Sequence, residues 1–304
     1  MAPKANLTAM ADIDINTREI DFVSRFAMDW RRLQEIMGIS RLIEKVPGQT
    51  LKVITASVTL QSGAVGEGEE IPYSKAEVEE TPITEATLLK YKKGVSIEAI
   101  NKYGYADAVA RTDTALLHQL QSNIMAQFFT FMLTGTASGT TSGGTFTPST
   151  YSTFQMACAM ARAAVIEKFE GMNLAVTEIV GFANVTDFYE YVGAANLTVQ
   201  TAFGLNYIEN FMGYNRIFLC DSNKIPSGKF VAIPVENLVA YYINPSTSDF
   251  AMAGLEFTVD GETPLVGFHT EGNYSTLVSE NTAIMGVYLF AEYLDGIAVV
   301  TIGE

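Results

Sequence analysis

The stretch GQTLKVITASVTLQSGAVGEGEEIPYSKAEVEETPITEATLLKYKKGVSIEAI, residues 48–100, decides the fold. Residues 51–60 are rich in β-branched side chains and partly alternate, which predicts a strand, and residues 83–97 predict its return. The 22 residues between them hold no turn of hairpin length. A loop this long in a compact domain is usually functional or disordered, so we expect an extended loop.

The loop is acidic and has too few apolar residues to build a core. It carries one lysine, Lys75, and six glutamates: Glu67, Glu69, Glu70, Glu77, Glu79 and Glu80. Its apolar residues, among them Ile71 and Tyr73, must be buried elsewhere. We expect the loop to lie across a basic face of another copy of the chain, with the charges fixing the register. A solvated acidic loop is the alternative.

Basic residues that could meet the loop are concentrated before position 94. A helix predicted over residues 17–37, with Asn16 as its N-cap and Gly38 as its stop, carries several of them and one tryptophan. This helix either packs on its own domain or reaches a partner, and the pattern favours neither. The candidate contact residues are Arg25, Trp30, Arg31, Arg32, Arg41, Lys90, Lys92 and Lys93.

The rest of the chain predicts an α+β protein. The apolar repeat of residues 105–133 predicts a helix far longer than average, which would form a spine. A Gly/Ser/Thr stretch, residues 134–149, follows and marks a domain junction. Beyond it we expect a helix at 151–169, a strand at 174–180, a helix from Asn184 or Thr186 to Gly193, and mostly antiparallel strands.

Length and charge narrow the class of protein. A chain of 304 residues suggests about two domains, and 48% hydrophobic residues indicate a globular fold. The net charge of −15 disfavours sequence-specific DNA binding and adhesion to anionic lipid. No signal peptide is expected. The most apolar window, residues 283–302, contains Glu292 and Asp295 and is interpreted as buried strand, not as a membrane span.

Catalytic, cofactor and metal sites are not expected. The two histidines, His118 and His269, have no neighbouring ligands at metal-binding spacing, and Cys158 and Cys220 fit reduced core thiols. The GAVGEG run lacks a following Lys-Ser/Thr and is flanked by acids that repel phosphate. We therefore predict no enzyme activity and no cofactor.

At this point the sequence resembles the major capsid protein of tailed bacteriophages, the Hong Kong 97 phage-type fold. The resemblance covers about residues 48–139 and rests on an ordered set of features: strand, loop with an EG…P passage, lysine-rich return strand with S-x-E, spine helix and glycine-rich passage. The matching positions are Glu67, Gly68, Pro72, Lys92, Lys93, Ser96, Glu98, Gly135 and Gly139.

The resemblance implies four parts. They are an N-terminal arm (1–45), a peripheral domain (46–61, 83–149 and 273–304), an extended loop (62–82) that lies on the adjacent subunit, and an axial domain (150–272). It implies a subunit that assembles with copies of itself into pentamers and hexamers of an icosahedral phage head enclosing double-stranded DNA, without sequence-specific binding and without a membrane.

Partners and location follow from the same resemblance. The short arm favours a separate scaffolding protein, and a portal protein and a decoration protein are further expected partners. The protein would be found in the virion, after assembly in the cytoplasm of the bacterial host. Covalent cross-linking is not expected, although Lys75 is available. The nearest alternative is an encapsulin-type nanocompartment shell protein, and a remote one is a hydrolase or a carbohydrate-binding module.

Overall fold

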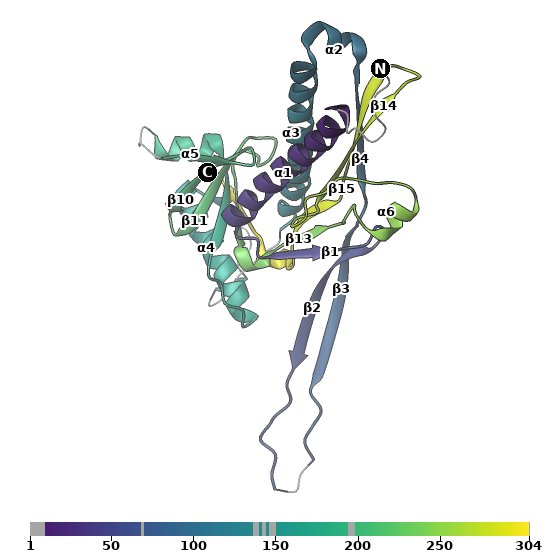
Figure 1. The fold of residues 1–304 in the computed structure, drawn as a ribbon. Helices are drawn as coiled ribbons and strands as arrows, with labels where there is room; N and C mark the ends of the chain where they lie inside the picture. Colours follow the sequence, from purple (N-terminus) through teal and green to yellow (C-terminus); the bar gives the residue numbers. More distant parts are fainter. Residues whose placement is uncertain are drawn as a thin grey trace, which may run out of the picture.

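The computed structural model describes residues 10–67, 70–135, 140–141, 144–145, 150–193 and 198–303. Helices and sheets form a body from which a long two-stranded hairpin projects (Figure 1). The predicted α+β class is confirmed. Among the residues described, no helix is long and apolar enough to cross a membrane.

The N-terminal helix α1 (Met10–Met37) packs on its own chain, which decides between the two possibilities left open by the sequence. The described part of the helix begins at Met10, earlier than the predicted start at Thr17, and the helix ends at Met37, directly before the predicted stop Gly38. Gly38 has φ of +68°, a conformation that favours glycine. The buried face of α1 is made by Phe22, Val23, Phe26, Trp30 and Leu33.

The hairpin consists of β2 (Thr50–Thr59) and β3 (Lys75–Glu85), which pair antiparallel from Thr50↔Glu85 to Thr59↔Lys75. Pairing thus begins at Lys75, inside the segment predicted to be loop. The predicted return strand, residues 83–97, is divided: its first part ends the hairpin, and its second part is β4 (Leu89–Ser96) in a different sheet.

Strand β4 lies at the edge of a three-stranded sheet of order β14-β15-β4, with β14 (Val266–Asn273) and β15 (Val278–Met285). Ser96 then caps the short helix α2 (Ile97–Tyr103) by accepting a hydrogen bond from the Ala99 amide. Helix α3 (Tyr105–Met132) follows directly and is the predicted spine. A second three-stranded sheet joins β1 (Arg41–Glu44), β13 (Leu238–Tyr242) and β16 (Val287–Ala291).

The largest sheet has seven strands. Its order is β7 (Thr150–Tyr151), β17 (Ala298–Ile302), β12 (Lys229–Pro234), β8 (Ile179–Asn184), β11 (Tyr214–Cys220), β10 (Leu205–Phe211) and β9 (Gln200–Ala202). The associated helices are α4 (Phe154–Gly171) and α5 (Val185–Val192), the latter capped by Asn184 and ended by Gly193 as predicted. The remaining elements are β5 (Thr140–Thr141), β6 (Gly144–Thr145), α6 (Ser248–Met252) and the 3-10 turns Val235–Asn237 and Leu294–Gly296.

Two hydrophobic cores lie on opposite faces of the seven-stranded sheet. Val180 and Phe182 of β8 face the larger core, which contains α1 and α3, while Ile179 and Ala183 of the same strand face the smaller core under α4. This alternation is expected for a strand buried on both faces. The arm helix and the spine helix therefore share one core with the strands.

The strand pairing departs from the predicted domain limits at two places. The predicted limit between residues 272 and 273 cuts through β14, and β17, which was assigned to the peripheral domain, pairs with β12 in the seven-stranded sheet. Sequence position could not show either point, because both depend on pairing between strands far apart in the chain. The division into four named domains otherwise stays a prediction.

Candidate functional site

The outer part of the β2–β3 hairpin projects from the body of the chain and is not covered by it (Figure 1). Leu51 and Ala86 at its base are fully buried. Farther out, exposed apolar side chains accumulate: Val58 (60% exposed), Leu60 (78%), Ile71 (72%), Tyr73 (92%) and Val78 (63%). An isolated two-stranded hairpin is at best marginally stable in water. These side chains therefore form an exposed apolar surface on the outer hairpin.

The glutamates of the hairpin differ in their surroundings. Glu80 accepts a hydrogen bond from Lys52 at 2.6 Å, and Glu77 pairs with Lys75, both at exposed positions. Glu67 and Glu70 are exposed and have no ion-pair partner within the part of the chain that the structure describes. Glu69 lies outside the described residues, as does the side chain of Glu79. Unpaired acids thus remain at the outer end of the hairpin.

Most of the predicted basic contact residues are paired inside their own chain. Arg31 binds Asp260 at 2.8 Å and Glu262 at 3.1 Å, and Arg41 binds Glu292. Arg25 lies 3.6 Å from Asp21, one helical turn away. These contacts connect elements of one subunit, so they reduce the positive charge available to a neighbour.

The lysines of β4 are paired as well. Lys92 contacts Glu280 and Glu271, and its hydrogen bond lowers the pKa of the Glu280 carboxyl. Lys93 points inward to Asp113, and burial lowers the pKa of its ammonium group although Asp113 opposes that shift. Lys93 therefore contributes to the interior of the chain.

Trp30 is not a surface residue, which corrects the prediction that it contacts another subunit. Its side chain is fully buried in the larger core, with its ring 6.2 Å from that of Phe203. Helical spacing placed Trp30 on the apolar face, but spacing does not tell what covers that face. Arg32 and Lys90 remain exposed without an ion-pair partner among the described residues.

A buried ionic network, which the sequence reasoning missed, connects α1 with α3 and β4. Asp113 of α3 accepts two hydrogen bonds from Arg18, at 2.7 and 2.8 Å, and a further one from Lys93. On the next position of α1, Glu19 accepts hydrogen bonds from the Thr270 amide at 2.5 Å and from the Thr258 hydroxyl at 2.6 Å. No local sequence signal links these residues, because the partners lie 20 to 251 positions apart.

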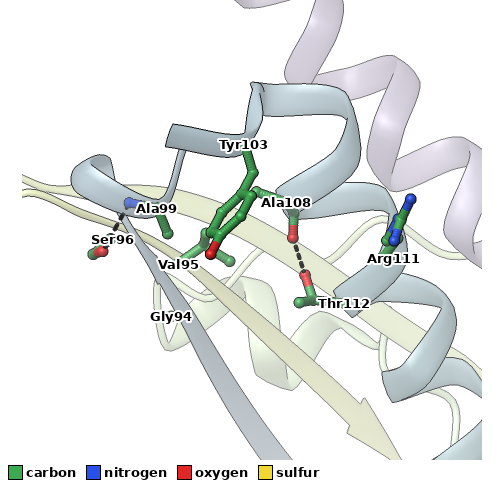
Figure 2. A pocket seen from close by; sticks show the side chains of 8 residues that line it. All are labelled: Gly94, Val95, Ser96, Ala99, Tyr103, Ala108, Arg111 and Thr112. Atoms are coloured by element: carbon green, nitrogen blue, oxygen red, sulfur yellow. Dashed lines mark hydrogen bonds between the residues drawn. The ribbon is translucent and has the colours of Figure 1, made fainter. Parts of the chain in front are cut away.

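A pocket of about 740 Å³ lies between β4, α2 and the first turns of α3 (Figure 2). Its wall combines Gly94 and Val95 of β4, Ala99 and Tyr103 of α2, and Arg111 and Thr112 of α3. In Figure 2 the Tyr103 ring points into the space between α2 and β4. Among the described residues, no group of three or more His, Cys, Asp or Glu side chains is arranged to hold a metal ion. The lining of the pocket is mainly apolar, with Arg111 as its basic side chain.

The arrangement of hairpin, spine and sheets is the one found in phage capsids. The capsid of cyanophage A-1(L) superposes with a TM-score of 0.52 at 12% identity, over 88% of this chain and 91% of that one. The mature capsid of bacteriophage PhiM1 gives a TM-score of 0.51 at 11% identity, over 88% and 86%. This chain has the Hong Kong 97 phage-type capsid fold.

The capsid fold is also matched, at a lower TM-score of 0.46 and 12% identity, by the SrpI encapsulin of Synechococcus elongatus PCC 7942, over 86% of this chain and 84% of that one. No family model matches the sequence, and no curated protein matches it. The similarity to solved phage capsids confirms, at the level of the fold, the resemblance stated from residues 48–139.

Proposed function

We propose that this chain is the major capsid protein of a tailed phage and that it assembles into pentamers and hexamers of an icosahedral head around double-stranded DNA. The exposed hairpin carries this proposal. Its apolar side chains, Ile71 and Tyr73 above all, are uncovered by the chain itself. In a closed symmetric shell every copy would cover the hairpin of a neighbour, and many weak contacts would sum to a stable particle.

The charge distribution supports the same proposal. The chain carries a net charge of −15, which repels phosphate, so DNA would be held by enclosure and not by a binding site. A separate scaffolding protein, a portal protein and a decoration protein are the proposed partners. The proposed location is the virion, with assembly in the host cytoplasm. No catalytic role is part of the proposal.

The test is assembly of the purified chain, with and without its candidate scaffolding protein, followed by size-exclusion chromatography and negative-stain microscopy. The matched variant replaces residues 60–74 by Asn-Gly, because Thr59 and Lys75 are directly paired and a two-residue turn can join them. We expect shells or capsomers from the natural chain and a folded monomer from the variant. A natural chain that stays a 33.1 kDa monomer under all conditions would contradict the proposal.

The contents of the particles distinguish a phage head from an encapsulin-type shell. Particles recovered from cells are treated with nuclease and then opened. Protected double-stranded DNA of uniform length is expected for a phage head. A folded enzyme as the main content, without DNA, would establish the encapsulin alternative.

A further inference from the structure

A second recess, of about 410 Å³, lies between the start of α4, helix α5 and the end of β17. Its volume lies within the range of ~300–1,000 Å³ that is usual for sites of small ligands. Figure 1 shows α5 and the C-terminal end of the chain beside each other, away from the hairpin. The recess shares no lining residue with the pocket between β4, α2 and α3, so it is a separate candidate site.

Two carboxylates line the recess from one face of α5. Asp187 and Glu190 are three positions apart, so they are neighbours on the helix surface, where like charges repel each other. Asp187 accepts hydrogen bonds from the Ser227 hydroxyl and the Gly228 amide, both at 2.6 Å, which fix its position. Glu190 is exposed, and as far as the structure describes the chain, neither carboxylate has an ion-pair partner. A bound cation would relieve their repulsion.

A tyrosine ring lines the recess beside these carboxylates. Tyr191 follows Glu190 in α5, and its ring stacks on that of Phe154 with centroids 5.4 Å apart. Phe154 is 4% exposed, whereas Tyr191 is 42% exposed. The buried ring therefore supports the outer one, which stays accessible from the recess. An aromatic ring supported in this way attracts a cation placed over its face.

The combination of carboxylates and ring suits a guanidinium group. A guanidinium is planar, donates two parallel hydrogen bonds to a carboxylate and stacks on aromatic rings, whereas an ammonium group is a compact, strongly hydrated charge. The lining residues that the structure describes include no lysine, arginine or histidine that could bind an anion. Because the N-terminus of α4 places a positive partial charge at the opposite wall, the cation would lie on the side of α5.

We propose that this recess binds a guanidinium group carried on an alkyl chain, with Glu190 and Asp187 as its acceptors and the Tyr191 ring as its stacking surface. An arginine side chain of another chain and a free guanidinium compound present the same group, and the experiment distinguishes these two sources. The inference does not depend on the proposed function, because the recess contains no residue of the hairpin.

The test is a ligand-observed NMR titration of the full-length chain, both as free subunits and as assembled particles. The probe is arginine amide, and the matched control is citrulline amide, which has the same shape without the charge. We expect saturable binding of arginine amide below about 10 mM, since a charged pair and a ring contact together exceed the weak binding that this limit allows. Citrulline amide should not bind, and lysine amide should bind more weakly than arginine amide.

Variants of the two exposed lining residues identify the site. Glu190→Gln should weaken binding of arginine amide roughly tenfold. Tyr191→Leu should weaken it about threefold to tenfold, whereas Tyr191→Phe keeps the ring and should retain binding. The matched controls are Glu170→Gln and Tyr189→Leu, which change exposed side chains of the same kinds outside the recess and should leave binding unchanged.

The outcomes decide both the site and the source of the ligand. Binding to free subunits alone would assign the recess to an arginine of another chain in the particle, and binding to both forms would assign it to a free compound. Equal binding of the two amides, no saturable binding, or unchanged binding in Glu190→Gln and Tyr191→Leu would overturn the inference. A chain that does not assemble would contradict the proposed function and leave the titration of free subunits valid.

Discussion

Arg18 and Asp113, 95 positions apart in the sequence, form a two-point ion pair in which the guanidinium Nε donates to Oδ2 at 2.7 Å and Nη2 to Oδ1 at 2.8 Å. Their side chains are only 11% and 9% exposed. The pair joins the first helix to the spine, and Lys93 of β4 contacts the same carboxylate. One carboxyl group thus connects three elements of the larger core.

Asp113→Ala should therefore destabilise the subunit by about 3–5 kcal/mol, because two cations would be left without their counter-charge. Urea unfolding of the assembly-blocked hairpin variant, followed by circular dichroism, measures this loss. Asp21→Ala is the control, since its pair with Arg25 is exposed and should contribute at most about 1 kcal/mol. Equal effects of the two changes would show that the buried network is not stabilising.

Trp30 is the single tryptophan and is fully buried, so its role should lie in stability. Trp30→Ala should lower the free energy of unfolding by about 3–5 kcal/mol. The fluorescence emission maximum of the natural chain should be the same in free subunits and in shells. A shift of that maximum on assembly would restore Trp30 to the contact surface.

Asp260 should make the contact with Arg31 sensitive to acid. Burial raises the pKa of this carboxyl, but hydrogen bonds from the side chain and amide of Thr263, together with Arg31, outweigh it, so the pKa is lowered. A carboxyl whose pKa is lowered by folding stabilises the fold at a pH above its pKa in the unfolded chain, about 3.9. This stabilisation is lost as the pH falls through the pKa of the folded chain. Carboxyl NMR titration should place Asp260 below about 3.9, and Thr263→Ala should raise its pKa. An unchanged pKa in that variant would refute the assignment.

Cys158 and Cys220 should be unreactive in the folded chain. Burial raises the pKa of both thiols, that of Cys220 to about 12, so at pH 8 neither forms the thiolate that reacts. A colorimetric thiol reagent should detect no free thiol in the native protein and two after addition of denaturant. Rapid reaction of either thiol in the native state would show that its strand or helix opens.

Glu67→Lys with Glu70→Lys should prevent assembly, because both acids are exposed at the outer hairpin. The free energy of unfolding of the subunit should not change, since neither residue contacts the body. Asp249→Lys with Glu256→Lys is the matched control at exposed positions elsewhere. Normal shells from the hairpin variant would mean that its charges do not guide the contact.

Local patterns were sufficient to predict the helices α1, α3, α4 and α5, but the short helices α2 and α6 were not predicted. The repeat of apolar residues identified α3 to within one residue at its end, and Asn184 and Gly193 marked the limits of α5. Helix α1 begins before its predicted start. Asn16 can cap a helix, but it does not prevent a helix from starting earlier in the chain. Such signals act within a few residues, so a single sequence contains them.

Contacts between distant residues could not be predicted in this way. The segment KAEVEE was assigned to the loop because of its acids, yet it pairs with β2 as part of β3. The sequence showed that basic residues are concentrated before position 94, but it did not show which of them are free to contact a partner. Arg31 and Arg41 are paired with Asp260 and Glu292, which lie more than 200 positions away. Only the folded chain shows which charges remain for a partner.

The packing of α1 against β14 also has a consequence for biosynthesis. The ring of Phe22 stacks on that of Phe268 with centroids 4.2 Å apart, and Glu19 binds the Thr270 amide. At ~5–20 residues per second, a ribosome completes Phe268 roughly 12–50 s after Phe22. During that interval the part of the apolar face of α1 that packs on β14 is uncovered and open to chaperones. Translation speed and chaperone supply would thus affect how many chains reach the folded state.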